Sequence, residues 1–377
     1  MKKMVAALVL GALVLSGTMV HGKEPLMQDL TMKEASIAEM KVDTRTFPVD
    51  SSILAKKVQF ENRYGFTVAG DMYLPKGFDH QKKYKAVVVS GPFGAVKEQS
   101  SGLYAQEMAK HGYVAVAFDP SMTGESSGKV RNMASPDIFT EDYSAAVDFV
   151  THLDFVDSEK VGAIGICGLS GMALTAATND VRIKAVATSA MYDMSESIRD
   201  HYKGDYYTPE QRELVKQHLA KTREYAARHG YGKKGAHELS VDANGHVVTQ
   251  ETMFPDTLPA DANAVVKEFY NYYVGRAYHP RAINSNTLAW DATSPYGFFH
   301  FRLMGNIDEI SPRPVLLITG DKAHSKYFSD AVYEKLKSPK EEIVVPGATH
   351  TDLYDQMDKI PFDRLVEFFD QALDVCR

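Results

Sequence analysis

Short apolar runs that alternate with helical stretches constrain the fold of this chain more strongly than any other feature. The runs are rich in Val and Ala and show little alternation between polar and apolar residues, as expected for strands covered on both faces. Helices between such strands imply a parallel sheet with right-handed crossovers. The sequence therefore predicts an α/β fold, with a mostly parallel sheet and helices on both faces. The runs are 86–89, 113–118, 161–166, 183–188, 314–320 and 342–347.

The first 22 residues have the pattern of a secretory signal peptide. Lys2 and Lys3 form a positive n-region, an apolar stretch follows, and Val20 and Gly22 place small residues at the cleavage site. The apolar stretch of about 17 residues is short for a membrane span, which needs roughly 20. We therefore expect cleavage, a periplasmic or secreted mature protein, and no stable membrane insertion after the signal is removed.

The remaining chain divides into an extension, a core and an insertion. A long stretch between the runs 183–188 and 314–320 is rich in aromatic residues and helix-prone. We expect it to be a helical cap inserted over the sheet. Its predicted helices cover 209–229 and 261–273, with Asp261 as N-cap of the second. A helix is also expected around 32–40. The predicted units are a signal peptide (1–22), an N-terminal extension (23–55), an α/β core (56–190 and 311–377) and a cap insertion (191–310).

Composition narrows the function classes. The formal net charge is −7, and no Lys/Arg-rich run is present, so nucleic acid is not an expected partner. Histidines lack metal-ligand spacing and no glycine-rich phosphate loop occurs, so neither a metal nor another cofactor is expected. The two cysteines, Cys167 and Cys376, are expected to be free thiols. A free thiol in an exported protein needs a reason, and catalysis is one.

The stretch 161–171 predicts a nucleophile elbow, in which a buried strand meets a sharp turn and then a helix. Cys167 occupies the centre of the turn, and Gly165 relieves crowding two residues earlier. The N-terminus of the helix favours negative charge, and a neighbouring protonated histidine would favour a thiolate further. Ser170 is the rival nucleophile, but its place in the first helical turn predicts a capping role. The alternative for Cys167 is a small buried apolar residue.

These residues resemble the nucleophile motif of the α/β-hydrolase superfamily, and within it the dienelactone-hydrolase-like branch, which has Cys in place of Ser. The resemblance covers about residues 55–375. The motif Gly-x-Ser-x-Gly becomes Gly165-Ile166-Cys167-Gly168-Leu169, with Leu169 where a second glycine is expected. Leucine there crowds the turn, so a local adjustment is expected. The resemblance implies the α/β-hydrolase fold and attack on an acyl group.

The resemblance also implies where the other catalytic groups lie. The base is expected on the loop after the last strand, where His350 stands. The acid is expected a few residues after the penultimate strand. The position nearest to expectation is Ala323, which is not acidic, so Asp321 is the first choice and Asp193, after the preceding strand, is the alternative. Either aspartate could instead cap a helix.

The oxyanion hole requires two backbone N–H groups directed at the developing charge. Gly168, directly after the nucleophile, is expected to supply one. The loop 91–94 is expected to supply the other, and Phe93 is chosen because Pro92 has no N–H. Asp119 and Glu125, on the loop after the next strand, are expected to be structural.

The sequence therefore predicts an exported enzyme that cleaves an ester, thioester or lactone of a small-molecule acyl substrate, with Cys167 as nucleophile and His350 as base. A peptidase or acyltransferase using the same groups is one alternative. A catalytically decayed binding protein on a hydrolase fold is another, because fold alone does not decide function. The sequence leaves homo-oligomerisation open.

Overall fold

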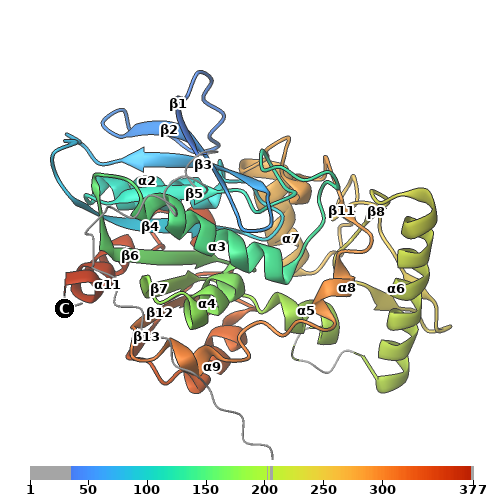
Figure 1. The fold of residues 1–377 in the computed structure, drawn as a ribbon. Coiled ribbons are helices and arrows are strands. Elements are labelled where there is room, and N and C mark those ends of the chain that lie inside the picture. Colours follow the sequence, from blue (N-terminus) through green and yellow to red (C-terminus); the bar gives the residue numbers. More distant parts are fainter. Residues whose placement is uncertain (1–34, 202, 204–206, 375–377) are drawn as a thin grey trace, which may run out of the picture.

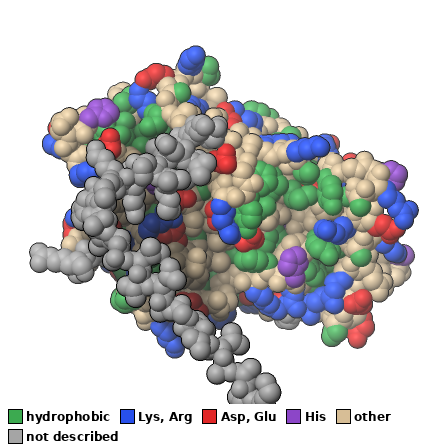
Figure 2. All heavy atoms as spheres, viewed as in Figure 1, with side chains coloured by type: hydrophobic (Ala, Val, Ile, Leu, Met, Phe, Trp, Pro, Cys, Tyr) green, Lys and Arg blue, Asp and Glu red, His purple; other side chains and the backbone are tan. Residues whose placement is uncertain are grey.

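The computed structural model describes residues 35–374 except 202 and 204–206 (Figure 1). The expected signal peptide lies outside the described residues. Within the part of the chain that the structure describes, no helix has both the length and the apolar character that a membrane crossing requires. On the face shown in Figure 2, basic and acidic side chains are interspersed with neutral and apolar ones.

Nine strands form one sheet, in the order β1-β2-β3-β5-β4-β6-β7-β12-β13. The six strands from β5 to β13 in that order run parallel, and β1, β2 and β3 pair antiparallel at one side. This confirms the predicted mostly parallel sheet. The strands are β1 Ser36–Glu39, β2 Leu54–Glu61, β3 Thr67–Leu74, β4 Tyr84–Ser90, β5 Val114–Phe118, β6 Val156–Ile166, β7 Ile183–Ser189, β12 Val315–Gly320 and β13 Lys340–Val345.

Helices cover both faces of the sheet, and each face has its own apolar core. Side chains alternate between the cores along a strand, since neighbouring residues point to opposite faces: Val88 packs in one core, and Val87 and Val89 pack in the other. The first core includes side chains of α3 (Pro136–Thr151), α4 (Leu169–Asn179) and α9 (Lys326–Lys335). The second includes side chains of α2 (Ser100–Lys110) and α11 (Phe362–Asp374).

The stretch predicted as a cap, 191–310, contains helices and short strands that Figure 1 shows beside one end of the sheet. Its longest helix, α6, covers the predicted 209–229, and its Thr208 and Gln211 form a capping box. The elements are α5 Met194–Asp200, α6 Pro209–His229, β8 Lys234–Gly235, β9 Ser240–Val241, β10 Val247–Val248, α7 Ala264–Tyr270, η2 Asn271–Arg276, η3 Ile283–Ser285, β11 Trp290–Asp291, α8 Pro295–Phe298 and η4 Ile307–Ile310.

Two local expectations are wrong. The helix expected around 32–40 is, in its described part, the strand β1, whose four residues are exposed and pair antiparallel with β2. Backbone pairing at the sheet edge, which no side-chain period reveals, forms this strand. The N-cap of α7 is Asn263 and not Asp261, because the Asn263 Oδ1 accepts the Val266 N–H at 2.9 Å.

Candidate active site

Cys167 sits at the turn between β6 and α4 with φ of +54°, in the left-handed region that a non-glycine residue seldom occupies. Its N–H donates to the Ser189 carbonyl at 2.9 Å, and its carbonyl accepts the Ser170 N–H at 3.0 Å. Gly165 is required here, since a Cβ at this position would lie 2.5 Å from the Ser170 Cα. The chain therefore forms the strand–turn–helix elbow that the sequence predicts.

Leu169, the departure from the usual motif, is accommodated by a glycine outside the elbow. The Leu169 side chain is buried in the core beneath α4. Gly91, on the loop after β4, passes directly over it, and a Cβ on Gly91 would lie 3.1 Å from the Leu169 Cβ and 2.1 Å from the Ile166 carbonyl oxygen. The missing side chain of Gly91 therefore provides the space that the motif's second glycine would otherwise provide.

Ser170 has the structural place expected for it. Its hydroxyl donates to the Gly165 carbonyl at 2.8 Å, and the residue is fully buried. This hydrogen bond closes the turn beneath Cys167 and directs the Ser170 hydroxyl into the protein, away from the cavity that Cys167 lines.

His350 is fully buried on the loop after β13, where the sequence places it. Its Nδ1 lies 2.6 Å from the Ser325 Oγ and its Nε2 lies 2.7 Å from the Tyr354 hydroxyl oxygen. That hydroxyl also acts on the Cys167 thiol, whose pKa it lowers. The structure thus links Cys167 and His350 through Tyr354, a residue that the sequence reasoning missed although it follows His350 by four positions.

Neither aspartate proposed as the acid contacts the His350 ring, so this expectation is corrected. The exposed Asp321 carboxylate accepts the Gly347 N–H at 2.7 Å and braces the loop before His350. The Asp193 carboxylate caps α5 and accepts the N–H groups of Ser195 and Glu196. Backbone N–H groups hold both carboxylates, that of Asp321 from the loop before His350 and that of Asp193 from its own helix. Ser325 takes the place beside Nδ1.

We expect Ser325→Ala to lower kcat about tenfold, because it leaves the buried Nδ1–H of His350 without its acceptor, a loss worth about 1.4 kcal/mol. Asp321→Asn is the matched control and should change kcat less than about threefold, because an amide oxygen still accepts the Gly347 N–H. Steady-state rates of the two purified variants compare them. A large loss in Asp321→Asn together with a wild-type Ser325→Ala would restore the aspartate as the orienting group.

The backbone N–H groups of Phe93 and Gly168, the two expected oxyanion-hole donors, both act on the Cys167 thiol and lower its pKa. Gly168 must lack a side chain, since a Cβ there would lie 2.7 Å from the Phe93 Cβ. The cap fixes the Phe93 peptide: the Asn284 Nδ2 donates to the Phe93 carbonyl at 2.6 Å, and the Trp290 ring stacks on the Phe93 ring at 4.5 Å between centroids.

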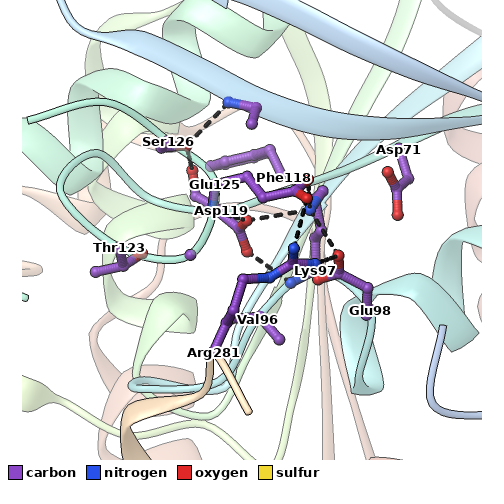
Figure 3. A network of polar contacts seen from close by, with 12 residues as sticks. Asp71, Val96, Lys97, Glu98, Phe118, Asp119, Thr123, Glu125, Ser126 and Arg281 are labelled. Carbon is purple, nitrogen blue, oxygen red and sulfur yellow. Dashed lines mark hydrogen bonds and ion pairs between the residues drawn. The ribbon is translucent and has the colours of Figure 1, made fainter. Parts of the chain in front are cut away.

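A buried cluster of ions holds the far end of the same loop (Figure 3). The Lys97 side chain is fully buried, and its Nζ lies 2.9 Å from Glu98, 3.2 Å from Asp119 and 2.6 Å from Glu125. The Asp119 Oδ1 also accepts the Lys97 N–H at 2.7 Å. Arg281 of the cap pairs with Glu125 at 2.6 Å and also with Glu98. Asp119 and Glu125 therefore join the loop, the sheet and the cap.

Burial favours the neutral forms of the Cys167 thiol and the His350 imidazole, whereas the sequence led us to expect a thiolate. Burial raises the pKa of Cys167 to about 11, although the Tyr354 hydroxyl and the N–H groups of Phe93 and Gly168 oppose that rise. Burial, together with the nearby His324, holds the pKa of His350 well below its usual value. For Cys167, the effect of burial on the pKa outweighs the opposite effect of the helix N-terminus. Both Cys167 and His350 are buried, and burial disfavours the charged form of each.

Alkylation of Cys167 by iodoacetamide should therefore be slow at neutral pH and should quicken about tenfold per pH unit between pH 7 and 9, because a pKa of about 11 leaves about one thiol in a thousand ionised at pH 8. Peptide mapping of the alkylated Cys167 at timed intervals gives the rate without interference from Cys376. A rate that is already constant below pH 8 would mean a preformed thiolate.

Cys167 lines a cavity of about 250 Å³ between the core and the cap. Most of its lining is apolar or aromatic. Glu238 is the one carboxylate among the described lining residues, and it accepts a hydrogen bond from the Ser197 hydroxyl at 2.6 Å. The cavity thus offers an apolar binding space at the nucleophile. The other lining residues are Phe93, Tyr192, Met194, His237, Met253, Phe254, Val265, Val266, Phe269, Tyr273 and Asn284.

Within residues 35–374, leaving out 202 and 204–206, no three His, Cys, Asp or Glu side chains are grouped so that they could hold a metal ion.

The sheet, the elbow and the histidine after the last strand together define an α/β hydrolase. The family model described as X-Pro dipeptidyl-peptidase (S15 family) matches residues 65–269, more than half of the chain. The chain belongs to this family.

Three known proteins illustrate the relationship. The uncharacterized protein PA2218 of Pseudomonas aeruginosa is 48% identical over 87% of this chain and 84% of its own length, and its crystal structure superposes with a TM-score of 0.80 over 90% of this chain and 99% of that one. The crystal structure of the α/β hydrolase GrgF from a Penicillium species shares the fold at 18% identity, with a TM-score of 0.67 over 85% of this chain and 99% of that one. The thiohydrolase aneE of Aspergillus aculeatus is 31% identical over 34% of this chain and 39% of its own length.

Proposed function

We propose that this protein is an exported hydrolase that cleaves an ester-type bond, with a thioester as the preferred class, through an acyl-enzyme on Cys167. One observation carries the proposal: the Cys167 sulfur stands on a nucleophile elbow within reach of two backbone N–H groups, at the floor of a largely apolar cavity. A buried structural cysteine has no need of two converging N–H donors.

The proposed reaction proceeds in two halves. In the first, the Cys167 sulfur attacks the carbonyl carbon while the Cys167 proton passes to His350, and the N–H groups of Phe93 and Gly168 stabilise the oxyanion. The carbonyl re-forms, and the imidazolium protonates the departing thiol or alcohol. In the second half, His350 accepts a proton from water, the hydroxide attacks the thioester carbon, and the acid leaves with the Cys167 thiol restored.

The neutral resting state fits this order of events. Since the thiol pKa lies near 11 and His350 is neutral, proton transfer accompanies attack and does not precede it. The enzyme would thus use cysteine as serine hydrolases use serine. A thioester suits such a site because attack by sulfur exchanges one thioester for another, whereas attack on an oxygen ester must form a less stable product.

Cavity shape and relatives support the substrate class. The lining of Met, Val, Phe and Tyr side chains favours an apolar acyl chain, and apolar burial provides most of the binding free energy in such pockets. The partial relationship to a fungal thiohydrolase supports thioesters over amides.

A panel of three probes with one acyl chain tests the proposal. The three probes are the butyryl thioester of N-acetylcysteamine, p-nitrophenyl butyrate and butyryl p-nitroanilide. Their turnover is compared at equal concentration. We expect kcat/KM to fall in that order, and all turnover to disappear in Cys167→Ala. Absence of Cys167-dependent turnover with every probe, together with no acylation of Cys167, would instead support the decayed binding protein.

A peptidase is the second candidate, and two observations favour it: the family match and the Glu238 carboxylate in the cavity. That carboxylate could pair with the ammonium group of a peptide N-terminus. Glycyl-prolyl p-nitroanilide and its N-acetylated form separate the two functions. Cleavage of the free-amine form alone, at a kcat/KM above that for the thioester, would establish the peptidase.

Export is also part of the proposal. It rests on the sequence pattern of residues 1–22. Fractionation of cells that express the full chain, followed by N-terminal sequencing, should find a mature protein that begins near residue 23 outside the cytoplasm. A full-length chain in the membrane fraction would overturn this part.

A further inference from the structure

Tyr354 is a buried tyrosine that contacts His350 and acts on the Cys167 thiol. It lies on α10 (Asp352–Asp355), the short helix directly after His350, and its side chain is fully buried. The Tyr354 hydroxyl oxygen is 2.7 Å from the His350 Nε2. The same hydroxyl acts on the Cys167 thiol, whose pKa it lowers. Among the described residues, the hydrogen-bond partners of the His350 ring are Tyr354 and Ser325, and the Cys167 sulfur is not one of them.

We propose that Tyr354 is a further catalytic residue, whose hydroxyl passes the proton between Cys167 and His350 in both halves of the reaction. This inference rests on the proposed function and adds a step to it.

The transfer balances without any other reactant. In the resting state the thiol S–H donates to the Tyr354 oxygen, the Tyr354 O–H donates to Nε2, and the Nδ1–H of His350 donates to the Ser325 oxygen. As sulfur attacks the acyl carbon, the S–H bond breaks and its proton joins the Tyr354 oxygen, while the original phenol proton joins Nε2. The phenol is neutral before and after, and the imidazolium then protonates the leaving group by the reverse shift.

The surroundings keep Tyr354 suited to this role. Burial, and the charges that would form on Cys167 and Tyr273, hold its pKa well above the usual value, so it stays protonated in every step. The Tyr273 ring packs on the Tyr354 ring, with 6.2 Å between the centroids. Tyr273 lines the cavity together with Asn284, the residue that fixes the Phe93 peptide. Residues of the cap therefore contact both Tyr354 and the Phe93 peptide.

Tyr354→Phe removes the hydroxyl and keeps the ring. We expect the pre-steady-state release of nitrophenolate from p-nitrophenyl butyrate to slow about a hundredfold, which is within the range for loss of a proton-transfer group. Tyr272→Phe is the matched control, because Tyr272 is equally buried and its ring packs 4.9 Å from the Tyr354 ring, outside the relay. The control should stay within about threefold of the wild type.

A proton inventory separates a relay from a merely positioning hydroxyl and needs only the wild-type protein. The acylation rate is measured in mixtures of light and heavy water. Two protons in flight give a curved dependence on the deuterium fraction, which supports the relay, and one proton gives a straight line, which overturns it. A Tyr354→Phe rate within about threefold of the wild type also overturns it, since His350 would then reach the sulfur directly.

Failure of the relay is distinguishable from failure of the function. If wild-type turnover requires Cys167 and His350 but the inventory is linear, the hydrolase stands and the relay is wrong. If no acyl group reaches Cys167 in the wild type, the proposed function itself fails, and with it the relay.

Discussion

Cys167→Ala is expected to lower kcat for the butyryl thioester at least about a thousandfold. The alanine removes the atom that forms the acyl-enzyme, while the oxyanion donors of Phe93 and Gly168 keep their places. The substitution removes a single sulfur atom and leaves the backbone hydrogen bonds of residue 167 in place. The free energy of unfolding should therefore change little. Initial rates at saturating substrate, with thermal unfolding of the same preparations, give both quantities.

Ser170→Ala is the control for this substitution, because it removes the neighbouring hydroxyl from the same turn. Loss of its hydrogen bond to Gly165 should cost about 1 kcal/mol of stability and leave kcat within about threefold. If Ser170→Ala is inactive and Cys167→Ala is active, the nucleophile has been placed on the wrong residue of the elbow.

His350→Gln is expected to lower kcat between about a hundredfold and ten thousandfold, the range for loss of a general base. Glutamine retains a polar group near Ser325 and Tyr354 but cannot accept and return a proton. The pH profile gives a second signature: a depressed pKa keeps the ring unprotonated below its usual range, so wild-type kcat/KM should begin to fall only well below pH 6.5. Rates from pH 4.5 to 9 measure both effects.

His324→Gln is the matched control for His350. The two rings lie 5.0 Å apart, but His324 contacts Tyr192 and lies 3.3 Å from Glu268 of the cap. We expect less than about a tenfold loss in kcat, since a neighbouring ring contributes packing and not proton transfer. A profile in which activity falls below a pKa near 6.5 in the wild type, and in which His324→Gln removes that limb, would transfer the role of base to His324.

Most of the fold was predictable because buried parallel strands leave a strong local pattern. The run 161–166 and the helix after it mark β6 and α4 from composition alone. The edge strand β1 was missed because its four residues are exposed and its order depends on backbone pairing with β2. The N-cap of α7 was predicted as Asp261 and is Asn263 for a similar reason. Both residue types are good N-caps, and the residue at which the helix begins depends on the fold.

The site was predictable where the local chain dictates the geometry and not where tertiary contacts do. Cys167 and Phe93 come from short motifs whose turns are fixed by glycines. Ser325 and Tyr354 carry no motif, and Ser325 reaches His350 only because the fold brings two separate loops together. The ionisation of Cys167 could not be derived from the helix N-terminus alone, because the extent of burial is a property of the folded core and cap.

The proposal that Cys167 forms a covalent acyl-enzyme is tested most directly by intact-protein mass spectrometry. Wild-type protein is mixed with excess p-nitrophenyl butyrate, quenched in acid within milliseconds to seconds, and digested to locate the adduct. We predict a mass increase of one butyryl group on the wild-type peptide that contains Cys167, and no such increase in Cys167→Ala. In His350→Gln the adduct should form slowly and then persist, because this variant cannot deacylate. A butyryl group on Ser170, or turnover of the ester with no adduct on Cys167 at any time, would contradict the account.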